Sequence, residues 1–156
     1  MIKASELKDT GKPGYRISEV QVGGVITLDL LKQLFVKTND EMYGLPVSIN
    51  KDQLKSGGLL NSTIEDCLVI TNTSHPTDYF KYCITLKKQG KMAFISLNYY
   101  GSSVLTGKMN KADERKKSGS LSGMLLNAIS GPNEAAYDAE YSYYDMIENI
   151  FAEICE

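Results

Sequence analysis

The chain of 156 residues contains one histidine, three cysteines and no run of 18 apolar residues. Any mechanism in which an imidazole activates a serine or cysteine would therefore have to use His75. Three cysteines are too few and too scattered for a disulfide framework, so we expect reduced thiols. Without a long apolar run or an apolar N-terminal stretch, we expect no membrane-spanning helix, no signal peptide, no membrane partner and a cytoplasmic location.

Short motifs of metal and nucleotide chemistry are also missing. No CxxC or HExxH pattern occurs, and Cys67 and Cys83, which could approach each other across neighbouring strands, do not make a zinc site by themselves. Five residues separate Gly101 from Gly107, and Met109 stands where a phosphate loop has the Ser or Thr that holds magnesium. We therefore expect no metal and no cofactor, and we assign no catalytic residue.

Charge is distributed unevenly, although the total is only −2. Residues 1–78 carry a net charge of −2, residues 79–119 carry +7, and residues 120–156 contain no Lys or Arg and carry −7. The basic stretch supplies a candidate anion-binding set of Lys108, Lys111, Arg115, Lys116 and Lys117. The alternative, which we favour, is a solvated segment that the acidic one neutralises, since a nucleic-acid partner normally brings a domain-wide basic excess.

Alternation of apolar and polar residues predicts an antiparallel meander. We expect strands near 64–72, 79–87 and 91–99, with a further candidate at 15–22 and a short one at 47–49. A two-residue loop at Gln89-Gly90 would place Tyr82 opposite Leu97 and Ile84 opposite Ile95, on one apolar face. The strand at 64–72 extends this face, with Ile64 opposite Leu86, although its register could differ by two residues. Something must then cover the apolar face.

Helices supply that cover. Thr27 is a candidate N-cap for a helix from Leu28 to about Thr38 or further, ended by Leu45-Pro46. Residues 50–54 are a candidate helical turn. Apolar and aromatic residues recur at helical spacing in a long C-terminal helix near 134–155. The sequence therefore predicts a single α+β domain over residues 1–156, an antiparallel sheet covered by helices, an arrangement common in small bacterial domains.

Ten tyrosines are the most unusual feature of the composition. Core packing, a protein interface and a ligand groove would each use them. The candidate ligand- or partner-binding residues are Tyr99, Tyr100, Tyr137, Tyr141 and Tyr144, with His75 and Asp78 in a neighbouring loop. Our leading hypothesis is a small, soluble, non-catalytic module that binds protein and self-associates through the tyrosine-rich helix and an exposed sheet edge. The alternative is a small-molecule-binding domain or minor enzyme with a tyrosine-lined groove between sheet and C-terminal helix.

Overall fold

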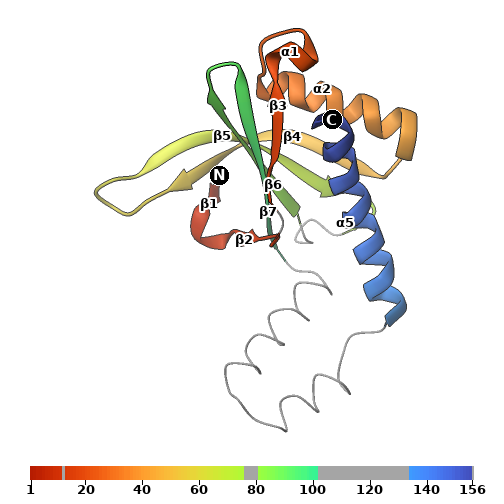
Figure 1. Ribbon diagram of the computed structural model, residues 1–156. Coiled ribbons are helices and arrows are strands. Elements are labelled where there is room, and N and C mark those ends of the chain that lie inside the picture. The colour runs from red at the N-terminus through yellow and green to blue at the C-terminus, as the bar shows by residue number, and fades with distance from the viewer. Residues whose placement is uncertain (12, 76–80, 102–133, 156) are drawn as a thin grey trace, which may run out of the picture. The chain divides into compact units, whose positions relative to one another are not determined.

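A computed structural model describes residues 1–11, 13–75, 81–101 and 134–155 (Figure 1). Met1–Gly101 and Glu148–Glu156 form one compact unit; of the second, Ser102–Ile147, only part of a helix is described. The described residues contain a mostly antiparallel sheet and helices, so the predicted α+β class is confirmed. A single domain over the whole chain stays a prediction.

Seven strands of the described residues form one sheet in the order β1-β4-β5-β6-β7-β2, and β3 also pairs with β7. All the pairings are antiparallel except that of β1 with β4. The strands are β1 (Ile2–Lys3), β2 (Lys8–Asp9), β3 (Tyr15–Ser18), β4 (Val47–Ser56), β5 (Thr63–Asn72), β6 (Lys81–Gln89) and β7 (Met92–Tyr100).

The β6–β7 hairpin has the predicted faces but not the predicted register. Its turn is Gly90-Lys91, so that Tyr82 faces Tyr99 and Ile84 faces Leu97, two residues from the expected pairing. Gly90 has a φ of +63° and takes the first turn position, where tight hairpins favour glycine, whereas it is the second residue of the predicted loop Gln89-Gly90. A shift of two keeps every side chain on its face.

The register of β5 against β6 also differs by two residues, as the sequence allowed: Leu68 faces Ile84 and Ile70 faces Tyr82. The two strands pair only over residues 68–71 and 81–84. The predicted contact of Ile64 with Leu86 is therefore wrong, because β5 leaves β6 before reaching Ile64, whose side chain is 55% exposed. Figure 1 shows the end of the β4–β5 hairpin projecting from the sheet.

Two local predictions fail because tertiary pairing overrides weak local preferences. Residues 50–54 are not a helical turn but the middle of β4, which pairs with β5 over its full length. The predicted strand at 15–22 ends at Ser18, whose hydroxyl accepts a hydrogen bond from the Val20 amide at 3.1 Å. There the short helix α1 (Glu19–Val22) begins, and it ends at Gly23, which has a φ of +68°.

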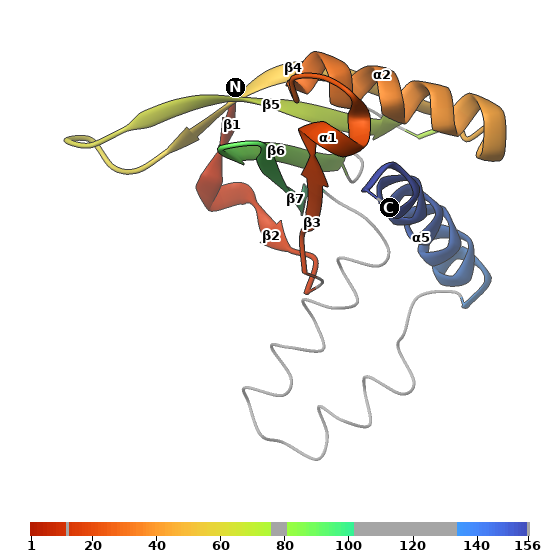
Figure 2. The ribbon, with the colours of Figure 1, turned by 45° about the horizontal axis from the view of Figure 1, so that its top comes forward.

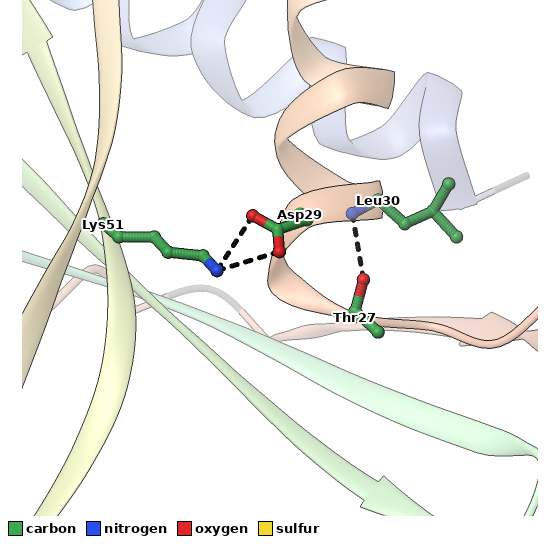
Figure 3. A network of polar contacts seen from close by, with 4 residues as sticks. All are labelled: Thr27, Asp29, Leu30 and Lys51. Atoms are coloured by element: carbon green, nitrogen blue, oxygen red, sulfur yellow. Dashed lines mark hydrogen bonds and ion pairs between the residues drawn. The ribbon is translucent and has the colours of Figure 1, made fainter.

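The helix predicted after Thr27 is confirmed as α2 (Leu28–Thr38). The Thr27 hydroxyl accepts a hydrogen bond from the Leu30 amide at 3.1 Å, as an N-cap does (Figure 3). A π-helical segment, η2 (Asn39–Tyr43), continues the chain to Gly44. Figure 3 also shows Asp29 of α2 paired with Lys51 of β4, with a shortest separation of 2.8 Å.

One face of the sheet carries the larger core. Leu31 and Phe35 of α2 are buried, and α2 runs along β4 and β5 (Figure 2). The predicted C-terminal helix is confirmed as α5 (Glu134–Cys155). Phe151 of α5 lies 5.3 Å from Phe35 and 6.2 Å from Tyr15, measured between ring centroids. The end of α5 and α2 therefore share an aromatic core on this face.

The opposite face is covered by the N-terminal strap, which we define as Ile2–Asp9. Because β1 pairs with β4 and β2 pairs with β7, the strap runs from one side of the sheet to the other. Beneath it Ile2, Leu54, Cys67 and Cys83 form a small buried cluster, against which Ala4 and Leu7 pack. Both faces of the sheet are thus closed by elements remote in sequence.

Candidate interaction surface

The predicted site residues that the structure describes differ in exposure. Tyr99 is buried and Tyr100 is half-buried, and as neighbours on β7 they point to opposite faces. Tyr144 is buried, whereas Tyr141, on the same helix, is 52% exposed. His75 is exposed. The side chain of Tyr137, and the whole of Asp78, Lys108, Lys111, Arg115, Lys116 and Lys117, lie outside the described residues.

Two tyrosines that we had not selected meet the end of α5 instead. The Tyr82 hydroxyl donates a hydrogen bond to Glu148 Oε1 at 3.3 Å, and the Tyr15 hydroxyl donates to the Glu148 carbonyl oxygen at 3.2 Å. Tyr82 and Glu148 are buried. The signal in the sequence was the spacing of two residues between Tyr15 and Ile17 and between Tyr82 and Ile84. Residues two apart in a strand share a face, so each tyrosine lies on the same face as a buried isoleucine. These bonds anchor the end of α5 to the sheet.

Cys67 and Cys83 are brought together, as the sequence allowed. Cys83 faces Val69, so that Cys67 is its diagonal neighbour on the same face, and the two thiols hydrogen-bond to each other. Burial raises the pKa of both thiols above the ordinary value. Both cysteines are free, and the described residues contain no group of three side chains suited to a metal ion. Protonated, buried thiols are poor nucleophiles, so this pair is structural in character.

The outer edge of β4 is the longest backbone edge in the described sheet without a strand beside it. β4 has ten residues, but β1 pairs only with Leu54 and Lys55. The Gln53 amide donates a hydrogen bond to the Asp52 carboxylate at 2.7 Å. This bond is the main reason that the pKa of Asp52 lies below its usual value. From Val47 to Lys51 no described strand lies along this side of β4, which we call its open edge.

The end of the β4–β5 hairpin carries the most exposed apolar side chains of the described residues. Leu59 is 106% exposed and Leu60 is 96% exposed. A hollow of about 420 Å³ lies beside them, and its lining includes Lys3, Ser5, Lys55, Gly57 and Ser62. Lys3 and Lys55 are directly opposite each other in the β1–β4 register. Neither the leucines nor this lysine pair was recognised from the sequence, because the projecting end depends on where β5 leaves β6.

No described helix is both long enough and apolar enough to cross a membrane. Comparisons with models of protein families, with curated proteins and with solved structures each give no match to this chain. The geometry therefore defines an α+β domain with an open sheet edge and an exposed apolar hairpin end, and function has to be inferred from those two surfaces.

Proposed function

We propose that the chain is a non-catalytic protein-interaction module that self-associates by pairing the open edge of β4 with the same edge of a second copy. The observation that carries the proposal is the outer side of Val47–Lys51, in a strand of ten residues, where no described strand pairs with β4. Exposed strand edges present unpaired N–H and C=O groups, which readily accept another strand.

The direction of these backbone groups follows from one hydrogen bond. The Thr73 amide donates to the Pro46 carbonyl oxygen at 3.0 Å, so the groups of Pro46 point toward β5. Hydrogen-bonded and non-hydrogen-bonded pairs alternate along an antiparallel ladder. The N–H and C=O groups of Val47, Ile49 and Lys51 therefore point away from β5, toward the open edge.

Two copies fit this edge in one register better than in its neighbours. With Ile49 opposite Ile49 of the second copy, each Val47 faces a Lys51, and all three outward-facing residues take part in hydrogen bonds. No two like charges stand directly opposite each other in this arrangement, which would be destabilising. The Lys51 ammonium keeps its ion pair with Asp29, since that pair lies on the α2 side of the sheet.

The test compares two substitutions at one position by native mass spectrometry and sedimentation. We expect the unaltered chain to have twice its mass of 17.3 kDa at tens of micromolar. Lys51→Pro removes an outward amide, and losing two hydrogen bonds of about 1 kcal/mol each raises the dissociation constant about 30-fold. Lys51→Ala is the matched control, because it removes the ion pair but keeps the amide, so it should remain dimeric.

Proline is tolerated on edge strands, and circular dichroism would verify the fold of the variant. A second test does not depend on proline. In the expected register Ser48 and Asn50 of the two copies are non-hydrogen-bonded neighbours, close enough for a disulfide. With Cys155→Ser as background, Ser48→Cys/Asn50→Cys should form a covalent dimer under mild oxidation, and neither single cysteine should. A monomeric unaltered chain, or equal effects of the proline and alanine variants, would refute the proposal.

The alternative function, a small-molecule site between sheet and C-terminal helix, has one supporting observation. Tyr15 and Tyr82 converge on Glu148, which gives that region hydroxyl and carboxylate groups side by side. A thermal-shift screen of nucleotides, flavins and common metabolites tests it. Stabilisation that Tyr82→Phe abolishes would favour this function over the interaction module.

A further inference from the structure

The β4–β5 hairpin ends in a short segment of unusual composition. Between Ser56 and Thr63 it contains glycine, leucine, asparagine and serine and no charged residue. Leu59 and Leu60 stand side by side at the tip and are almost entirely in contact with water. Ile64, at the start of β5, adds a third exposed apolar side chain. Adjacent, fully exposed leucines on a projecting turn indicate a surface that becomes covered in function.

Directly behind this apolar tip lies a pair of like charges. Lys55 is four residues from Leu59, and Lys3 stands opposite Lys55 on the neighbouring strand. Neither lysine forms an ion pair with a described residue. Like charges opposite each other on adjacent strands are destabilising unless an anion lies between them. The hydroxyls of Ser5 and Ser62 line the same hollow and could donate further hydrogen bonds.

We propose that this hairpin tip docks on an anionic phospholipid bilayer. Leu59 and Leu60 enter the boundary between headgroups and acyl chains, and Lys3 and Lys55 bind the lipid phosphates. The order of residues along the hairpin, apolar at the end and cationic directly behind it, matches the order of layers at a bilayer surface. This mode of attachment needs no spanning helix, so it departs from the sequence-based expectation that the chain has no membrane partner.

A bilayer accounts for the shape and charge of the tip better than a folded partner does. The leucines are almost fully exposed on a projecting turn, whereas a protein partner would have to supply a matching pocket. A fluid layer accepts such a turn without one, and the two lysines are complementary to its phosphates. The tip lies at the other end of β4 from Val47–Lys51, so this proposal does not depend on self-association.

Acidic side chains near the tip set the limits of the interaction. Glu65 and Asp66 of β5 lie one and two residues beyond Ile64, and Glu6 belongs to the strap. They oppose attachment to an anionic surface and confine it to the end of the hairpin. Replacing Glu65 by glutamine should therefore strengthen vesicle binding several-fold, since it removes one negative charge near the anionic surface.

The experiment is flotation of the full chain with vesicles of phosphatidylcholine alone or with about 30% phosphatidylglycerol. We expect binding to the anionic vesicles that weakens as salt is raised. Leu59→Ser/Leu60→Ser should lower the partition coefficient about 100-fold, because two leucine side chains no longer leave water. Lys3→Gln/Lys55→Gln should lower it about 30-fold.

Matched controls lie elsewhere on the chain. Val20→Ser/Val25→Ser removes two exposed apolar side chains, and Lys87→Gln/Lys91→Gln removes two exposed lysines. Neither control should change vesicle binding by more than about two-fold. The residues altered in all four double variants are exposed, so the thermal midpoint of each variant should stay close to that of the unaltered chain.

Three outcomes would overturn the proposal. The first is absence of flotation with anionic vesicles, which is also the result expected if the tip binds a protein. The second is binding that the leucine variant retains. The third is binding of free inorganic phosphate that Lys3→Gln/Lys55→Gln abolishes, without any binding to vesicles, which would identify a site for a soluble anion instead. The dimer test has a separate readout, so failure of either proposal leaves the other intact.

Discussion

The two hairpins of the sheet have strands of almost equal length but very different surroundings. The β6–β7 hairpin lies inside the sheet, with β5 on one side and β2 and β3 on the other, and turns tightly at Gly90-Lys91. The β4–β5 hairpin has an open edge on β4. Its strand β5 pairs with β6 only from Leu68 to Thr71, and the end of the hairpin carries exposed leucines. Both hairpins contribute buried residues to the core, but only the β4–β5 hairpin also carries the two proposed contact surfaces.

The difference indicates where this fold can tolerate change. Buried residues of β6–β7 are constrained by packing on the sheet face, whereas residues at the end of β4–β5 contact mostly solvent. Exposed leucines add nothing to the stability of the isolated chain. Their exposure is therefore compatible with a role in binding. The leucines and the outer side of β4 are the two surfaces of this hairpin that the proposals use.

The largest expected effect on stability comes from truncating an isoleucine to alanine, which should differ between the two hairpins. Ile84→Ala in β6 leaves a cavity at a fully buried site and should lower the free energy of unfolding by about 2–5 kcal/mol. Ile64→Ala in β5 should change it by no more than about 0.5 kcal/mol, since that side chain is largely exposed. Urea denaturation measures both, and similar losses would mean that the β4–β5 end is packed after all.

A smaller effect distinguishes the two turns. Gly57 has a φ of +90°, and a Cβ there would collide with the Asn61 carbonyl oxygen, so Gly57→Ala should cost about 2–3 kcal/mol. Gly90 has a φ of +63° but open space around it, so Gly90→Ala should cost only about 1 kcal/mol. Gly58, with open space and no positive φ, is the control and should tolerate alanine. Equal losses of stability for Gly57→Ala and Gly58→Ala would show that the expected collision at Gly57 does not occur.

The smallest effect concerns the ion pair that ties the β6–β7 hairpin to α1. Lys88 lies 2.6 Å from Glu19 and holds the pKa of that carboxyl below its ordinary value of 4.5. A lowered pKa in the folded state means that the pair stabilises the fold above the ordinary pKa. This contribution is lost as the pH falls through the lowered pKa.

Glu19→Gln should therefore lower the thermal midpoint slightly at neutral pH, and the difference from the unaltered chain should shrink as the pH falls below 4.5. Glu41→Gln, which removes an exposed carboxylate of η2, provides the comparison and should show no such trend. A difference at Glu19 that grew toward acid pH would reverse the assigned sign.

Local signals predicted a good part of the fold. The Thr27 cap predicted the start of α2, and apolar and aromatic residues at helical spacing predicted α5. Alternation predicted the faces of β5, β6 and β7. For the candidate site, the sequence predicted an exposed sheet edge, but it also selected Tyr99 and Tyr100, which lie on opposite faces of the sheet, and several residues outside the described part of the chain. It missed Leu59, Leu60, Lys3 and Lys55.

What the sequence determined by itself is periodicity: which residues share a helix face or a strand face, and where caps and glycines interrupt them. That information is local, because side-chain direction repeats every two residues in a strand and about every 3.6 in a helix. Only the tertiary structure decided the hairpin register, the length of β4, the separation of β5 from β6 and the crossing of the strap. Each depends on pairing between distant segments, where a shift by two residues preserves the alternation and the local pattern therefore cannot choose.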